Sequence, residues 1–180
     1  MPTAGDHALG GAPFNTTGGI HEIPTGVAGR MFVCGKHHIG PDVHSVLAHT
    51  DNAHVVCLVE RHELEHRYDD YLAWLDAGGD STWFPVHDMH APRLADAQLL
   101  FSALAGMLRD GRNVVIHCAA GIGRAGTTAA GTLMFLGMSS AEALALVRGH
   151  RPMAGPQTQV QQLLLDELQV HLDGGTPRLG

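Results

Sequence analysis

The stretch Ile116–Thr127, which reads IHCAAGIGRAGT, joins the apolar run of residues 113–117 to a helical pattern that begins near residue 124. Small residues fill the connection, so the backbone can turn sharply there and approach a ligand closely. In α/β folds, ligands collect where such connections leave the carboxyl ends of the strands. Cys118 stands at that position, where it can do chemistry that a core cysteine cannot.

The rest of the chain alternates between short β-favouring runs and longer helical patterns. Runs that are apolar at consecutive positions indicate strands covered on both faces. Together they predict an α/β fold with a central, mostly parallel β-sheet flanked by helices. We expect strands at 31–34, 55–59, 82–86 and 113–117, and helices at 41–49, 62–76, 94–109, 124–136, 140–150 and 158–172.

Length and composition favour a single domain. The 180 residues are 44% hydrophobic, which suits one sizeable core. Residues 1–20 are rich in Gly, Pro and Thr without apolar periodicity, and we expect a flexible leader there. The domain is then expected over 21–172, with a C-terminal tail at 173–180.

Charge and cysteine content narrow the partners and the compartment. The net charge is −7, Lys36 is the only lysine, and the arginines are scattered, so neither nucleic acid nor an anionic membrane is expected as a partner. No signal peptide and no apolar stretch of about 20 residues is recognisable. An odd number of cysteines suits a reducing environment, and we expect a cytoplasmic protein.

The turn after Cys118 has the composition of an anion-binding loop. Consecutive backbone N–H groups and the start of a helix both favour negative charge, either on a thiolate or on a phosphate. Arg124 can hold two phosphate oxygens with its planar guanidinium group. A thiolate below a bound phosphate is placed for in-line attack, which gives a phosphocysteine. The expected N–H donors belong to Ala119, Ala120, Gly121, Ile122, Gly123 and Arg124.

At this point the sequence resembles the cysteine-dependent protein tyrosine and dual-specificity phosphatases. Their signature is His-Cys, two residues, Gly, two residues, Arg, and it is matched by His117, Cys118, Gly121 and Arg124. Spacing and length are most similar to the compact kinase-associated phosphatase (cyclin-dependent kinase inhibitor 3-like) type. The resemblance implies the protein tyrosine phosphatase-like fold, a phosphorylated protein or peptide as substrate, and no metal or cofactor.

The resemblance also implies an acid and a glutamine. The family's general acid is an aspartate some thirty residues upstream, after a strand and followed by a proline. Asp88, in the segment 84–92, has that setting, whereas Asp96 lies inside the next helical pattern. Gln157 corresponds to the glutamine that positions the hydrolytic water, and Gln161 remains an alternative.

One residue departs from the family pattern. Ala125 follows Arg124, where most members carry a Ser or Thr whose hydroxyl donates a hydrogen bond to the cysteine sulfur. Without that hydrogen bond, breakdown of the phosphocysteine is expected to limit turnover. Thr127, in the first helical turn, is the candidate that could supply the hydroxyl instead.

Cys34 and Cys57 fall within apolar strand runs, which favours core packing for both. For Cys57 the resemblance leaves a second interpretation open. Compact relatives can place a second thiol near the nucleophile, so a reversible Cys57–Cys118 disulfide would protect the thiolate from over-oxidation.

A competing pattern, His62-Glu63-Leu64-Glu65-His66, fits the H-E-x-x-H motif of zinc proteases. No convincing third ligand follows it, so we expect no metal site. The preceding Glu60 and Arg61 follow a core strand. Together with His62 they are expected either to line the rim of the Cys118 pocket or to be a solvated helix start.

These observations favour a phosphatase acting on phosphotyrosine proteins, with phosphoserine and phosphothreonine left open. A small-molecule phosphomonoesterase and a phospho-binding pseudophosphatase are the alternatives. Phosphoinositides are disfavoured because Ala119, Ala120 and Ile122 stand where lysines would bind extra phosphates.

Overall fold

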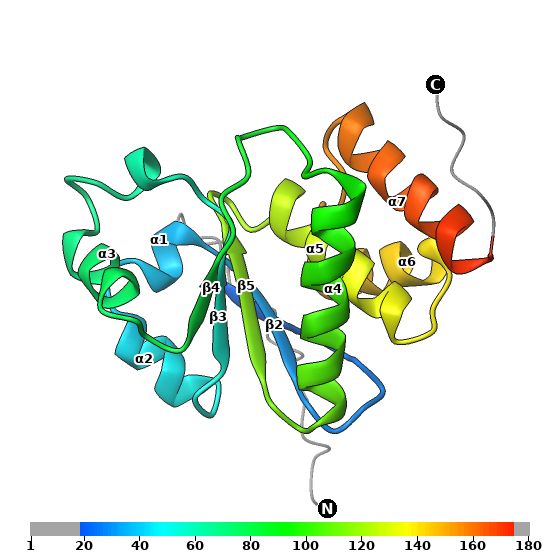
Figure 1. Cartoon of the computed structure of the whole chain (residues 1–180). Coiled ribbons are helices and arrows are strands. Elements are labelled where there is room, and N and C mark those ends of the chain that lie inside the picture. Colours follow the sequence, from blue (N-terminus) through cyan, green and yellow to red (C-terminus); the bar gives the residue numbers. More distant parts are fainter. Residues whose placement is uncertain (1–18, 175–180) are drawn as a thin grey trace, which may run out of the picture.

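The computed structural model describes residues 19–174, and its centre is a five-stranded sheet of order β1-β2-β5-β3-β4 (Figure 1). β1 is antiparallel to β2, and the other neighbours are parallel, so the predicted mostly parallel sheet is confirmed. The strands are β1 (Ile20–Ile23), β2 (Met31–Gly35), β3 (His54–Cys57), β4 (Ser81–Trp83) and β5 (Val114–Cys118).

Helices cover both faces of this sheet. α4, α5, α6 and α7 form a layer on one side, and α1, α2 and α3 lie on the other (Figure 1). Their bounds are α1 (Lys36–Ile39), α2 (Val43–His49), α3 (Asp69–Asp76), α4 (Leu94–Arg109), α5 (Gly123–Phe135), α6 (Ser140–His150) and α7 (Gln159–Leu172). The leader expected at 1–20 lies almost wholly outside the described residues, whose first strand begins at Ile20.

α5 is the central helix, and its small residues explain how it fits. It packs against α4, α6 and α7 as well as against β5 and β2. A Cβ on Gly126 would lie 2.1 Å from the Gly155 nitrogen, and one on Gly131 would lie 2.3 Å from the Phe101 ring. Larger residues would push these neighbours apart. The helix that follows the Cys118 loop is therefore held on all sides.

The expected helix over 62–76 is wrong in its first half. A short 3₁₀ helix, η1 (Arg61–Glu63), is followed by turns, and α3 begins only at Asp69. His66 has a φ of 63°, outside helical geometry, and its N–H donates to Asp69 Oδ1 at 2.8 Å. A turn held by the Asp69 side chain thus replaces the continued helix.

The edges of the sheet also differ from expectation. The four-residue strand β1 was not expected, because it lies beside a Gly- and Pro-rich segment. β4 ends at Trp83 and is only half-buried, as an edge strand should be. The residues after β4 nevertheless run alongside the end of β3, since Phe84 N donates to Cys57 O and Val86 N donates to Leu58 O.

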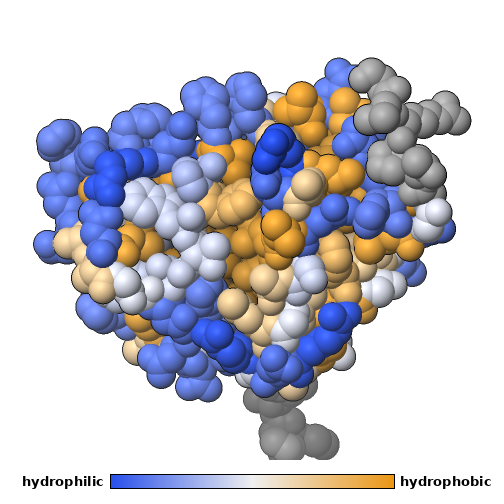
Figure 2. Space-filling view, viewed as in Figure 1, coloured by the Kyte–Doolittle hydropathy of each residue, from blue (hydrophilic) through white to orange (hydrophobic). Residues whose placement is uncertain are grey.

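Figure 2 shows apolar side chains near the middle of the viewed face, over α4, and further ones toward its upper right. Leu99, Leu100 and Met107 of α4 line a hollow together with Phe84. Among the helices of residues 19–174, none is long and apolar enough to cross a membrane.

Candidate active site

Four parallel strands end at the same edge of the sheet. β5 ends at Cys118, β2 at Gly35, β3 at Cys57 and β4 at Trp83. Because β5 lies between β2 and β3, the segments that follow these strands surround the loop after Cys118. The tertiary order therefore decides which side chains meet the predicted anion site.

The carbonyl groups of the Cys118 loop are held from outside. Each one in residues 119–122 accepts a hydrogen bond: Ala119 from Lys36 N, Ala120 from Arg151 Nη2, Gly121 from Arg151 Nε, and Ile122 from Gly155 N. The N–H groups of residues 119–122 donate to no group in the described part of the chain. This arrangement suits an anion, because a run of inward N–H groups forms a concave donor site.

Gly121 gives the loop its shape. Its φ of 69° lies in the left-handed region, and a Cβ there would meet the Cys34 carbonyl oxygen at 2.3 Å. Only glycine fits both conditions without strain. α5 then begins at Gly123, with Ile122 as its N-terminal cap.

Arg124 is buried, and its guanidinium group contacts three residues. Its Nη1 and Nη2 donate to Glu63 Oε2 and Oε1 at 2.8 and 2.9 Å, and Nη1 also donates to Val86 O at 2.8 Å. Nη2 lies 3.1 Å from Asp88 Oδ1. Burial alone would lower the pKa of Arg124, but Glu63, Cys118 and Asp88 together raise it above its ordinary value.

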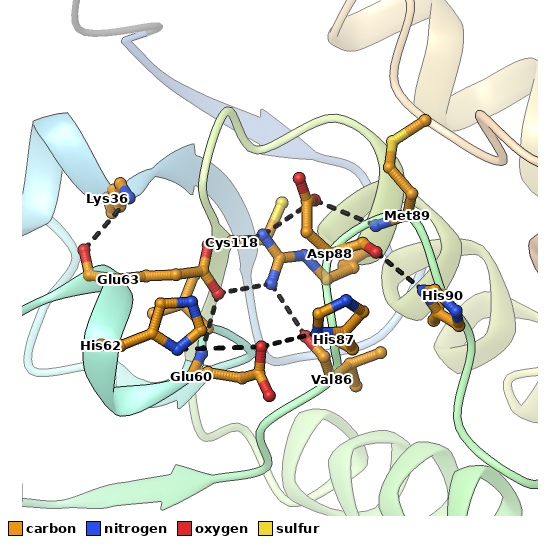
Figure 3. A network of polar contacts seen from close by, with 12 residues as sticks. Lys36, Glu60, His62, Glu63, Val86, His87, Asp88, Met89, His90 and Cys118 are labelled. Atoms are coloured by element: carbon orange, nitrogen blue, oxygen red, sulfur yellow. Dashed lines mark hydrogen bonds and ion pairs between the residues drawn. The ribbon is translucent and has the colours of Figure 1, made fainter.

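Glu63 is the functional residue that the sequence analysis missed in this role. Burial alone would raise its pKa, yet the Arg124 contacts and the backbone hydrogen bond from Glu60 keep the pKa below its ordinary value. Glu60 N donates to Glu63 Oε2 at 2.9 Å, and Lys36 Nζ donates to Glu63 O at 3.1 Å (Figure 3). The sequence did carry a signal for this role, because Glu63 is an acidic residue shortly after β3, at the edge of the sheet where Cys118 lies.

The zinc interpretation of residues 62–66 is not supported. Glu63 binds Arg124, the His62 side chain is largely exposed, and the broken helix removes the shared face of His62 and His66. Within residues 19–174 no cluster of three or more His, Cys, Asp or Glu side chains is arranged to hold a metal ion.

The tertiary structure brings Asp88 to Arg124. Its side chain is 63% exposed, and Oδ1 also accepts a hydrogen bond from Met89 N at 3.0 Å (Figure 3). Met89 has a φ of 62°, which shapes the turn that presents Asp88. Asp96, the alternative acid, lies in α4 and pairs with Arg93 at 2.9 Å instead.

The two candidate glutamines have different surroundings. Gln161 is buried; its Nε2 donates to His90 O at 3.1 Å and its Oε1 accepts from Gln157 N at 2.8 Å. Gln161 thus ties the Asp88 loop to the start of α7. The Gln157 side chain is exposed, and its Oε1 would meet a Cβ on Gly123 at 2.3 Å. Gln161 Oε1 would meet the same Cβ at 3.2 Å, so both side chains reach the loop and Gln157 comes closer.

His117 and Thr127 are both buried beside the loop. His117 Nε2 lies 2.7 Å from the Tyr71 hydroxyl, and burial lowers the pKa of His117 to about 4, so it is neutral near pH 7. Thr127 Oγ1 has no hydrogen-bond partner among the described residues, Cys118 included. It lines a narrow cavity with Val86, His90 and Gln161. Ala125 is fully buried.

Cys57 faces away from Cys118. The register pairs Cys57 and Cys34 with His117 from either side, and successive side chains of a strand point to opposite faces. Burial raises the pKa of both Cys34 and Cys57 to about 12. All three thiols are free. The Cys57–Cys118 disulfide stays a prediction, and the register weighs against it.

The chain resembles several solved phosphatases. Tk-PTP in its active form is 30% identical, with 82% of this chain and 95% of that chain covered and a TM-score of 0.64. Kinase-associated phosphatase, solved with its catalytic cysteine replaced by serine, is 20% identical, with 88% and 97% covered and a TM-score of 0.72. Human DUSP28 is 19% identical, with 84% and 95% covered and a TM-score of 0.64.

No curated protein sequence matches the chain. A family model does: the Swiss Army Knife protein, DSP-PTPase phosphatase domain, matches residues 27–168. That match includes the whole Cys118 loop, η1, the Asp88 segment and both glutamines. The chain therefore belongs to the dual-specificity and tyrosine phosphatase superfamily, as a member of its Swiss Army Knife phosphatase-domain family.

Proposed function

We propose that this phosphatase domain hydrolyses phosphotyrosine in proteins through a phosphocysteine intermediate, with no metal ion or cofactor. The observation that carries the proposal is the convergence on one loop. Arg124 lies in contact with Asp88, and both lie beside a loop whose carbonyl groups are all held outward. The Cys118 loop supplies the nucleophile and the anion-binding arginine, and the separate segment around Asp88 supplies the acid.

In the first step, the Cys118 thiolate attacks phosphorus and the bond to the tyrosine oxygen breaks. The electron pair of that bond goes to the phenolic oxygen, which takes a proton from the Asp88 carboxyl group. Arg124 and the N–H groups of the loop hold the phosphoryl oxygens as charge spreads over them. The products of this step are free tyrosine hydroxyl and phosphocysteine.

In the second step, water attacks the phosphocysteine. Asp88, now a carboxylate, accepts a proton from that water, and the sulfur leaves as a thiolate. Gln157 is the residue proposed to orient the water, since its side chain reaches Gly123 at the start of α5. Inorganic phosphate leaves and the starting state returns.

The substrate class follows from the loop. PTPMT1, a solved relative of the same fold, was crystallised with PI(5)P. In this chain Ala119, Ala120 and Ile122 offer no cation to a second phosphate group, which favours a protein substrate over a phosphoinositide. The free thiols suit a reducing compartment, and we place the enzyme in the cytoplasm.

The test measures turnover of an aryl phosphate, of phosphotyrosine, phosphoserine and phosphothreonine peptides, and of PI(5)P, each with a chelator present. Wild type should hydrolyse the aryl phosphate and the phosphotyrosine peptide, and Cys118→Ser should hydrolyse neither. Turnover of small phosphomonoesters alone would favour the small-molecule alternative. Phosphopeptide binding without turnover would indicate a pseudophosphatase, and loss of activity with chelator would contradict the metal-free mechanism.

A further inference from the structure

A groove of about 650 Å³ lies beside the candidate active site, and we call it the acidic groove. Its walls come from the residues around η1 and from the chain that follows β4. The lining residues are Glu60, Arg61, His62, Glu65, Trp83 and Pro85. No step of the proposed mechanism uses this groove.

The acidic groove borders the site directly. Glu60 N donates to the same Glu63 oxygen that Arg124 Nη1 holds. On the opposite wall, Pro85 precedes Val86, whose carbonyl also accepts from Arg124. The two segments that fix the phosphate-binding arginine thus also form the groove. A peptide whose phosphorylated residue enters the Cys118 loop must pass its flanking residues along this region.

The charge of the acidic groove is negative near neutral pH. Its only arginine, Arg61, is paired with Asp76 through contacts of 2.6 and 3.2 Å, which offsets its charge. Glu65 forms no ion pair with any residue in 19–174, and Glu60 is paired only with histidines, His87 at 2.9 Å and His62 at 4.0 Å. Two carboxylates are therefore available to a cation.

The floor of the acidic groove is apolar and fixed in place. The Trp83 Nε1 donates to Val59 O at 2.9 Å, and the guanidinium group of Arg61 lies 4.9 Å from the centre of the indole ring. Trp83 and Pro85 both line the groove, so the part of the ring that Arg61 leaves uncovered offers apolar surface for aliphatic carbons. A long cationic side chain has the matching chemistry, since its methylene groups pack on apolar surface while its charged end reaches a carboxylate.

We propose that the acidic groove binds a lysine or arginine side chain next to the phosphorylated residue of the substrate. This inference rests on the proposed phosphatase function and adds a substrate preference to it. A phosphate dianion must approach a site that already contains the carboxylates of Glu60 and Glu63 (Figure 3). A cation beside the phosphate offsets part of the repulsion between those carboxylates and the substrate.

The test compares three phosphotyrosine peptides that are identical except for arginine, glutamine or glutamate at the positions flanking the phosphotyrosine. Wild type should give the highest kcat/KM with arginine and the lowest with glutamate, and the two should differ by roughly three- to tenfold per engaged carboxylate. Glu65→Lys should abolish or reverse this order and leave turnover of a small aryl phosphate unchanged. Glu65→Gln should flatten the order and serves as the milder variant.

Glu167→Lys is the matched control, because it makes the same charge change on an exposed residue of α7. It should keep the wild-type preference. Equal kcat/KM values for the three peptides in wild type would overturn the groove proposal. An unchanged preference in Glu65→Lys would overturn it as well. In both cases turnover of the aryl phosphate would still support the proposed function. If wild type hydrolysed nothing, the proposed function would fail. The affinities of the three peptides for Cys118→Ser would then test the groove proposal, and equal affinities would overturn it.

Discussion

Two buried arginines belong to or contact the Cys118 loop, and their partners differ. Arg124 and Arg151 are each 4% exposed. The guanidinium group of Arg124 contacts carboxylates: Nη1 and Nη2 both donate to Glu63, and Nη2 also lies near Asp88. Arg151 donates hydrogen bonds to the carbonyl groups of Ala120 and Gly121, and its Nη1 lies 2.6 Å from His21 Nδ1.

The pKa values of the two arginines shift in opposite directions. Burial lowers the pKa of Arg151, and no carboxylate in residues 19–174 pairs with it to offset this. For Arg124 the acidic neighbours outweigh burial and raise the pKa. An arginine that faces carboxylates can exchange one of them for a phosphate group, whereas an arginine that faces carbonyls holds the backbone in shape. In the proposed mechanism Arg124 binds the phosphate group, whereas Arg151 holds the backbone of the loop.

The largest expected effect comes from Arg124→Lys. A point charge cannot reproduce the two-point grip on a phosphoryl group, so kcat/KM for an aryl phosphate should fall by about a hundred- to a thousandfold. Steady-state kinetics measure the loss, and circular dichroism with thermal unfolding checks that the variant is folded. Near-full turnover would remove Arg124 from the mechanism.

Asp88→Asn changes the exchangeable carboxylate of Arg124. Turnover of a phosphotyrosine peptide should fall by about a hundredfold, because the phenolic oxygen then leaves without a proton. An ester whose leaving group is a weak base should be affected far less. The comparison needs both substrates with the same enzyme preparation. Equal losses on the two would assign Asp88 a structural role.

Ala125→Ser restores the hydroxyl that the family pattern carries after Arg124. If phosphocysteine breakdown limits turnover, wild type should release close to one equivalent of leaving group in a rapid-quench burst. The serine variant should turn over about ten- to a hundredfold faster, through one hydrogen bond of about 1.5–3 kcal/mol to the departing sulfur. Ala129→Ser buries a hydroxyl one turn further on as the control. No burst and no gain would contradict the hypothesis.

Arg151→Lys tests the loop-holding side of the comparison. Lysine cannot donate to both carbonyls in the same geometry, so the protein should lose about 2 kcal/mol of unfolding free energy. Inorganic phosphate should also inhibit several-fold more weakly, which a purely structural role distant from the loop would not produce. Arg148→Lys, on an exposed residue of α6, is the control. Unchanged phosphate inhibition would show that the loop keeps its shape without Arg151.

The smallest effect concerns pH. Burial lowers the pKa of His21 below 6.5, and the charge of Arg151 lowers it further. The unfolded chain therefore binds the proton more readily, and stability that is present above pH 6.5 is lost as pH falls through the folded-state pKa. Glu63, with a pKa held below 4.5 against the opposing effect of burial, contributes stability that is lost only at lower pH.

His21→Gln should therefore make the pH dependence of stability shallower just below pH 6.5. Part of the slope should remain, because the folded-state pKa of His117 is lowered from 6.5 to about 4, so the unfolded chain binds that proton more readily as well. Urea unfolding from about pH 7.5 down to about pH 4 measures both windows. If the pH dependence of stability just below pH 6.5 were unchanged in His21→Gln, protonation of His21 beside Arg151 would cost the folded protein no stability.

Local sequence patterns determined most of the elements and the centre of the site. The expected bounds of α4 and α6 match the structure, because each has a clear apolar period; for α6 a Ser139–Glu142 capping box also marks the start. The Cys118 loop could be predicted because its donors, its glycine turn and Arg124 are contiguous in the chain. These residues can bind an anion because of the local backbone conformation of the loop, which neighbouring residues such as Gly121 specify.

Tertiary structure alone decided what surrounds that loop. Glu63 meets Arg124 across 61 residues of sequence, and Gln161 meets His90 across 71. Such pairs depend on β3 lying beside β5 and on α7 packing against α5, which local periodicity does not encode. The segment 62–66 shows the consequence. Its spacing matched a helical metal motif, but the ion pair between Glu63 and Arg124 and the turn at His66 gave those residues a different structure.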